Sequence, residues 1–135
     1  MQTIEFDSGM EEFRLSCGGV LRFNPADPNL YARFLEAEDK LDQLEKALLA
    51  DARAMEQENA GKAVLVLLHK ADWELKNILG WVFGEENDFH ALLGGVNLLA
   101  VAGNGRRVVE NLFSALEPVL EDGISRCARQ AAQQC

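Results

Sequence analysis

The first part of the chain alternates between apolar and polar positions. Ile4 and Phe6 stand between polar neighbours, and the same period of two returns at Phe13, Leu15 and Cys17. A period of two is typical of a β-strand with one buried face. The pattern therefore predicts an N-terminal β-element of two or three strands, in which the strand of Ile4 and Phe6 packs beside a hairpin.

Two adjacent glycines separate the second strand from a returning strand, and they restrict how the two strands pair. A loop of three residues that ends at Gly19 pairs Leu15 with Leu21 and Phe13 with Phe23, so that apolar residues share one face. A loop made of the two glycines alone opposes Leu15 to an arginine. We therefore predict the three-residue loop, with Gly19 in the left-handed conformation. A lone hairpin is only marginally stable, so we expect it to rest on helices.

A long helix is predicted directly after the hairpin. Asp27 and Pro28 have the order of an N-cap and a first helical residue, since the carboxylate accepts an unpaired backbone N–H and proline lacks one. No glycine or proline interrupts the sequence from Leu30 to about Glu58. Roughly 30 helical residues extend about 45 Å, which is longer than a compact domain of this size usually needs.

Apolar residues on this helix recur every seven positions and form a seam. The seam consists of Phe34, Leu41, Leu48 and Met55, with Leu30, Ala37 and Leu44 between them. Such a repeat is typical of helices that pair along their length. Two arrangements fit it: the helix pairs with a second chain, or it forms an internal helical hairpin with the next segment.

A second helix, predicted from Lys62 to Phe83, is apolar around most of its circumference. Such a helix is covered on several sides, either as the central core or as a surface for self-association. Large aromatic side chains often dominate the energy of protein interfaces. Trp73, Trp81 and Phe83 are therefore the residues expected to anchor an interface on this helix.

Shorter patterns complete the predicted fold. The residues from Asp88 to Leu93 suggest one or two helical turns, and those from Gly103 to Gly105 a turn. Arg106 to about Gln130 predicts a further helix, which Pro118 should kink or divide. The fold class expected is α+β, predominantly α, with the helices packed as a bundle.

Length and charge bound the class of protein. The 135 residues fit one domain, with a β-element over 1–24, a helical part over 27–130 and a frayed tail over 131–135. A formal net charge of -9 disfavours binding to nucleic acid or to an anionic membrane. The sequence has neither a signal-peptide pattern nor a stretch approaching about 18 apolar residues. We therefore expect a cytoplasmic protein.

Candidate catalytic and metal-binding residues are few. His69 and His90 are the only histidines, and neither belongs to a recognised catalytic or zinc-binding motif. A metal site would require the fold to join them and nearby aspartates. Cys17, Cys127 and Cys135 are widely separated, which fits reduced thiols rather than a disulfide framework. We expect no catalytic residue, no metal and no cofactor.

Several short motifs occur in an order that resembles a known family. Phe23-Asn24-Pro25-Ala26-Asp27-Pro28 leads into a long helix rich in Glu and Lys, Trp81-Val82-Phe83-Gly84 follows, and Phe-Ser-Ala-Leu-Glu-Pro stands at 113–118. This order is similar to that of small tail assembly chaperones of long-tailed bacteriophages and prophages. The resemblance gives its matching residues a structural role only; they include Phe23, Asn24, Pro25, Asp27, Pro28 and Gly84.

The resemblance implies a function that the residue patterns alone do not. Members of this family hold the long, aggregation-prone tape measure protein in the host cytoplasm before the tail tube polymerises. The expectation is a non-catalytic chaperone that binds tape measure helices and forms homo-oligomers. The alternative is a generic adaptor of regulatory type, whose long first helix dimerises through the seam.

Overall fold

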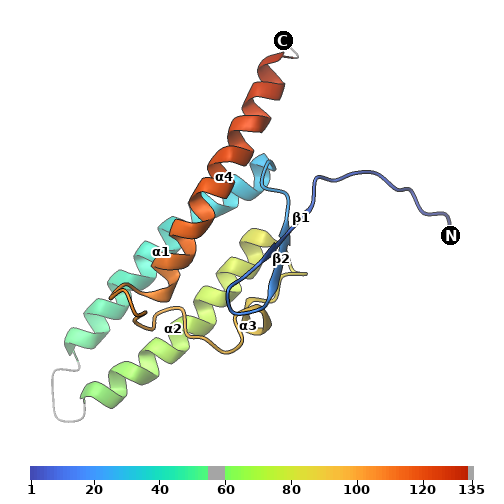
Figure 1. The fold of residues 1–135 in the computed structure, drawn as a ribbon. Helices are drawn as coiled ribbons and strands as arrows, with labels where there is room; N and C mark the ends of the chain where they lie inside the picture. Colours follow the sequence, from blue (N-terminus) through green and yellow to red (C-terminus); the bar gives the residue numbers. More distant parts are fainter. Residues whose placement is uncertain (55–59, 134–135) are drawn as a thin grey trace.

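One hairpin and four helices make up the part of the chain that the structure describes (Figure 1). The computed structural model describes residues 1–54 and 60–133. In chain order the elements are β1 (Glu11–Arg14), β2 (Val20–Phe23), α1 (Pro28–Ala54), α2 (Ala60–Phe83), α3 (Phe89–Leu92) and α4 (Val108–Gln133). Helices α1 and α2 lie side by side, α4 packs on α1, and the hairpin lies near the end of α2. The predicted α+β, predominantly α fold class is confirmed.

The two strands pair in a register that differs from the predicted one. Phe13 stands opposite Leu21 rather than Phe23, and Leu15 bonds to Gly19, whose carbonyl accepts the Leu15 N–H at 2.8 Å. The predicted register is therefore wrong by two residues. A shift of two leaves every side chain on its own face. Phe13 and Phe23 accordingly still stack, with ring centroids 4.8 Å apart.

The glycines at the loop explain this difference. Gly18, not Gly19 as predicted, has the left-handed backbone, with a φ of 102°. Gly19 instead lies so close to α3 that a Cβ atom there would overlap the Leu92 carbonyl. This glycine serves close packing against the next layer, a requirement that the local sequence does not reveal.

Residues 1–10 form no strand, so the predicted strand of Ile4 and Phe6 beside the hairpin is wrong. The segment extends away from the body of the protein (Figure 1). Its direction is set just before β1, where Asn24 donates its side-chain N–H to the Ser8 carbonyl at 3.1 Å and Gly9 has a φ of 79°. This contact directs the backbone away from the sheet edge.

The junction between hairpin and helix follows the prediction. The Asn24 Oδ1 accepts the Ala26 N–H at 2.9 Å, which closes a tight turn. The Asp27 carboxylate accepts the Asn29 N–H, also at 2.9 Å, and α1 begins at Pro28. Asp27 is therefore the N-cap that the Asp-Pro order predicted.

The seam of α1 packs inside the chain. Its residues Leu30, Phe34, Ala37 and Leu48 are buried, Leu41 and Leu44 are partly buried, and Met55 lies outside the described residues. Contacts between α1 and α2 make an internal helical hairpin. Of the two arrangements that fitted the seam, the structure has the one within a single chain.

Asn87 joins the end of α2 to the sheet. Helix α2 ends at Phe83 and is followed by Gly84, whose φ is 109° and whose N–H donates to the Gly80 carbonyl at 2.9 Å. The buried Asn87 amide then accepts the Arg22 N–H at 2.9 Å and donates to the Arg22 and Phe83 carbonyls at 2.7 and 2.9 Å. The Asn87 side chain thus pairs with the edge of β2 as a neighbouring strand would.

Pro118 was predicted to kink or divide this helix; α4 continues through it, so the helix is not divided there. Pro118 has no N–H for the Ser114 carbonyl, but both residues are exposed and water can bond that carbonyl. The helix also continues past Gln130 to Gln133, and residues 134–135 lie outside the described part. Before it, the predicted turn at Gly103 to Gly105 is present, closed by the Ala102 N–H on the Arg106 carbonyl at 2.7 Å.

Gly123 provides a test of how α4 packs on the hairpin–helix junction. A Cβ atom at Gly123 would overlap the Pro25 carbonyl, whereas one at Gly61, also in a helix, would meet nothing. We expect Gly123→Ala to lower the free energy of unfolding by about 3 kcal/mol, the upper end of overpacking costs. Gly61→Ala should not lower it, because alanine favours a helix over glycine. Urea unfolding of both variants checks this, and equal stability would contradict the packing.

Candidate functional site

Four side chains along α2 are exposed on one side of the helix. Leu65, His69 and Trp73 are four residues apart, and Val66 stands three residues before His69, which places the four on one face. Leu65, Val66 and Trp73 are 66%, 55% and 60% exposed. We call these four residues the α2 stripe. Large apolar side chains gathered at the surface in this way are typical of sites that bind other proteins.

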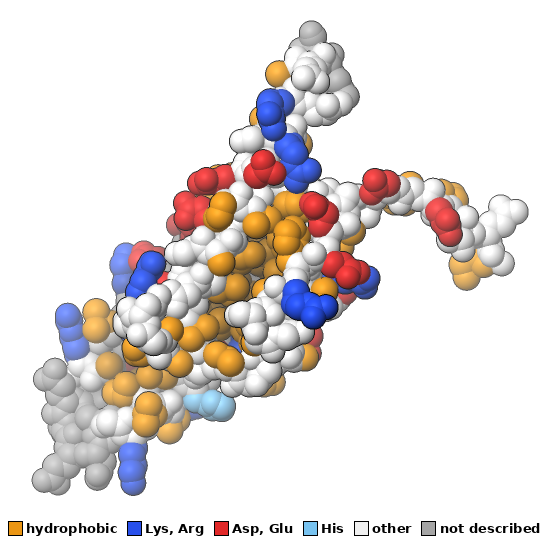
Figure 2. All heavy atoms as spheres, viewed as in Figure 1, with side chains coloured by type: hydrophobic (Ala, Val, Ile, Leu, Met, Phe, Trp, Pro, Cys, Tyr) orange, Lys and Arg blue, Asp and Glu red, His pale blue; other side chains and the backbone are white. Residues whose placement is uncertain are grey.

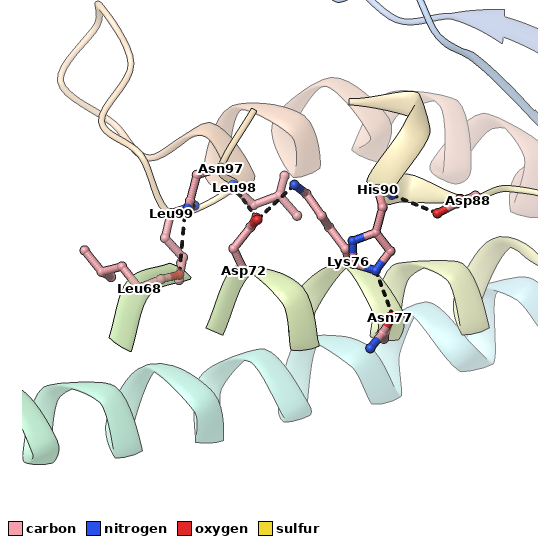
Figure 3. Close-up of polar contacts among 9 residues, drawn as sticks. All are labelled: Leu68, Asp72, Lys76, Asn77, Asp88, His90, Asn97, Leu98 and Leu99. Atoms are coloured by element: carbon pink, nitrogen blue, oxygen red, sulfur yellow. Dashed lines mark hydrogen bonds and ion pairs between the residues drawn. The ribbon is translucent and has the colours of Figure 1, made fainter. Parts of the chain in front are cut away.

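Trp73 is held in place by α3. The Asp88 carboxylate caps α3 by accepting the His90 N–H at 3.0 Å. The His90 ring packs on Trp73 with centroids 4.1 Å apart. The His90 Nε2 lies 2.9 Å from the Asn77 Oδ1 (Figure 3). The indole is therefore fixed on one side and open on the other, which reduces the entropy lost when a partner binds.

The charges beside the α2 stripe differ from the balance of the whole chain. Lys62 and Lys70 are exposed near it, with Glu74 as the nearest acidic residue on the same part of α2. His69, Lys70, Trp73 and Glu74 line a shallow cleft there. The exposed charged residues of α2 beside the stripe, two lysines and one glutamate, are net positive, although the formal net charge of the chain is -9. It suits a partner whose apolar residues are flanked by carboxylates.

A buried ion pair lies on α2 next to the stripe, since Asp72 stands three residues after His69 and Lys76 three residues after Trp73. Asp72 and Lys76 are buried, and their Oδ2 and Nζ atoms lie 2.9 Å apart. The second Asp72 oxygen accepts the Leu98 N–H at 2.8 Å, and Asn97 reaches the Leu68 carbonyl at 3.5 Å (Figure 3). These bonds fasten the loop before α4 to α2. Both oxygens of Asp72 have protein partners, so its role is structural.

The structure divides the predicted interaction residues into two groups. Phe34, Leu48 and Phe83 are buried and Leu41 is partly buried, so these side chains are occupied in the core. Trp73 and Trp81 are exposed. Met55, the remaining member, lies outside the described residues.

Trp81 connects α1 with α2. The Lys40 Nζ lies 4.2 Å from the centroid of the Trp81 ring, a distance at which the cation is attracted to the face of the indole. Trp81 is 43% exposed, less than Trp73. Of the two exposed tryptophans, Trp73 therefore offers the larger free surface to a partner.

Sequence reasoning did not single out Leu65, Val66 and His90 as surface groups. The run from Val64 to Leu68 is apolar at every position, so the sequence shows no face that is free. His90 comes from a different helix, and only the fold brings it to Trp73. The sequence does contain a pattern that predicts the buried ion pair: Asp72 and Lys76 have opposite charges and are four residues apart within an apolar helix.

The candidate metal-binding side chains form no metal site in the described part of the chain. Within residues 1–54 and 60–133, no three His, Cys, Asp or Glu side chains are grouped to hold a metal ion. The Cys17 thiol is exposed and donates to the Leu92 carbonyl at 3.2 Å, Cys127 is partly exposed, and Cys135 lies outside this part. None of the described helices combines the length and the apolar character that crossing a membrane requires.

Comparison with models of protein families, with curated proteins and with solved structures finds no match to this chain.

The buried Asp72–Lys76 pair can be tested against an exposed pair of the same spacing. Asp72→Ala leaves the Lys76 ammonium and the Leu98 N–H without their partner, so we expect a loss of about 3–5 kcal/mol in unfolding free energy. Asp42 and Lys46 are also four residues apart, with side chains 61% and 75% exposed. Asp42→Ala should cost less than about 0.5 kcal/mol. Chemical denaturation measures both, and similar losses would show that the buried pair has no special role.

Proposed function

We propose that this chain is a non-catalytic tail assembly chaperone of a long-tailed bacteriophage or prophage, and that its client is the tape measure protein. The class comes from the ordered motifs that resemble this family. The observation that supports client binding is the α2 stripe, an exposed apolar face on a helix with a rigid tryptophan. The proposed place of action is the cytoplasm of the bacterial host.

The α2 stripe has the dimensions of a helix-binding surface. Its four residues span about 12 Å, or slightly more than two helical turns, at the rise of an α-helix. An amphipathic client helix can place apolar side chains three, four and seven residues apart against such a face. Lys62 and Lys70 favour acidic residues beside those apolar positions. We therefore propose an amphipathic helix with acidic flanks as the bound part of the client.

The size of this surface suits a chaperone that must release its client. A few exposed apolar side chains bury far less area than a permanent interface does. Binding through them is weak and readily reversed, which a transient complex before tail-tube polymerisation requires. In this complex Trp73 contributes most of the binding energy, and the residues around it exclude water from the contact.

The residues behind the family resemblance act differently. Phe23 packs against Phe13 and Phe83, Asp27 caps α1, and Gly84 ends α2. All three support the fold rather than a binding surface. Client recognition is therefore assigned to the α2 stripe and not to the shared motifs.

The adaptor alternative depended on the α1 seam as a dimer contact. In the described residues, the seam positions Phe34 and Leu48 are buried within the chain. Dimerisation through them would require the α1–α2 hairpin to open. No other observation favours the adaptor, so the chaperone is the function we propose.

Binding to tape measure fragments tests the proposal. Purified full-length chain should retain helical tape measure fragments in a pull-down at micromolar concentration. The double variant Leu65→Asp, Trp73→Asp should bind at least about tenfold more weakly, because burial of a large apolar side chain contributes roughly 1.5–3 kcal/mol. Both side chains are exposed, so far-UV circular dichroism and thermal unfolding should show an intact fold.

Leu35→Asp is a suitable control. Leu35 is 46% exposed on α1, where it lines a cleft with residues of α4 rather than α2. It should leave client binding unchanged. If wild-type chain retains no fragment, the proposed client is wrong; if the double variant binds as wild type does, the stripe is not the client site. A gene neighbourhood without a long tape measure gene would count against the whole proposal.

A further inference from the structure

The two edges of the sheet differ: the β2 edge is bonded at Arg22, whereas the β1 edge is open. On β2, the outward backbone groups of Arg22 are bonded by Asn87. Glu12 stands opposite Arg22, and Arg14 lies two residues further along β1. In an antiparallel sheet, two opposed residues both point their backbone N–H and carbonyl groups toward the partner strand in one pair. In the next pair, both point these groups away from it, to the outer edges of the sheet. Glu12 and Arg14 therefore direct their N–H and carbonyl groups to the outer edge of β1.

These edge groups have no hydrogen-bond partner in residues 1–54 and 60–133. Both Glu12 and Arg14 are exposed. A row of exposed, unpaired backbone groups accepts an additional strand.

An apolar cleft lies beside this open edge. The end of β1 and its loop form one side, α4 forms the other, and the lining includes Arg14, Leu15, Val96, Val108, Leu112 and Ala115. An ion pair of 3.7 Å between Glu11 and Arg126 spans from β1 to α4. Figure 2 shows apolar side chains in the hollow between α4 and the hairpin. Because alternate side chains of a strand share a face, a strand added to β1 would direct every second side chain into this cleft.

Residues 3–7 have the pattern of such a strand. Ile4 and Phe6 alternate with polar residues and are 86% and 80% exposed. The Asn24 side chain holds the start of this segment, because it bonds the Ser8 carbonyl and lies so close to Gly9 that a Cβ atom there would be 2.6 Å away. In Figure 1 the segment leads away from its own sheet. It is therefore presented to another molecule.

The charges of segment and edge are complementary. A strand with Ile4 and Phe6 in the cleft has Glu5 and Asp7 on the opposite, outer face. Arg14 lies on the outer face of β1, and in the described part of the chain no ion pair involves it. Its neighbour on that face, Glu12, is already paired with Arg22. The outer face thus has an arginine available where the added strand would bring a carboxylate.

We propose that residues 3–7 of a second copy form a third strand on the open edge of β1, with Ile4 and Phe6 in the cleft between β1 and α4. Each copy has one such segment and one such cleft. Reciprocal exchange between two copies therefore closes a dimer. This contact needs no client and does not involve the α2 stripe, so it is independent of the proposed function.

Light scattering of the purified full-length chain tests the exchange. Wild type should form a dimer, with twice the chain mass of 14.9 kDa. Phe6→Asp places a charge in the apolar cleft, and the dissociation constant should rise at least about tenfold. Thr3→Asp adds the same charge on the opposite face of the added strand, outside the cleft, and should leave the mass unchanged. A monomeric wild type, or a Phe6→Asp dimer as stable as wild type, would overturn the proposal.

Cross-linking identifies the occupant of the cleft. In a background with Cys17→Ser, Cys127→Ser and Cys135→Ser, chains with Ile4→Cys are mixed with chains with Ala115→Cys and treated with a short bismaleimide. Linked pairs of chains are expected from this mixture. Ala32→Cys, an exposed position on α1, replaces Ala115→Cys as the control and should yield few.

Two results of the cross-linking would refute the exchange. Equal yields from the two mixtures would mean random collision. A chain with both Ile4→Cys and Ala115→Cys that links only to itself would mean that the segment returns to its own sheet. In either case the second copy is not the occupant.

Discussion

The structure depends on one buried amide, that of Asn87, which bonds the sheet and the end of α2 at the same time. Its three hydrogen bonds satisfy the Arg22 backbone and the Phe83 carbonyl, so no buried polar group is left unpaired at this junction. A two-stranded hairpin is marginal alone. Here it gains both a substitute neighbour for β2 and an aromatic contact, because Phe23 packs edge-on against Phe83 at 5.0 Å.

This junction also decides which surfaces stay open. The Asn87 side chain bonds the outward Arg22 groups of β2, whereas the outward groups of both Glu12 and Arg14 on β1 have no partner in residues 1–54 and 60–133. The loop that follows Asn87 caps α3 through Asp88 and so brings His90 against Trp73. The open strand edge and the rigid tryptophan of the α2 stripe are thus consequences of the same few residues. They lie on different elements, which allows self-association and client binding to operate separately.

The local patterns in the sequence predicted most elements, because each depends on neighbouring residues. Asp27 and Pro28 start a helix by their own chemistry, and the period of two in the hairpin survives even a register error of two residues. The candidate site was predicted less well. The seam of Phe34 and Leu48 suggested an interface but is buried in the core, whereas Trp73, one of the aromatic candidates, is exposed. An apolar seam has the same pattern whether its partner helix belongs to the same chain or to another.

The sequence by itself determined the fold class, the Asp27 cap and the turn at Gly103 to Gly105, since backbone preference and side-chain hydrogen bonds act over a few residues. Only the tertiary structure decided which apolar faces are covered. Gly19 is required by the Leu92 backbone, Gly123 by Pro25, and the exit of residues 1–10 by Asn24. These constraints join residues far apart along the chain, and close packing is a property of the assembled body that no local pattern records.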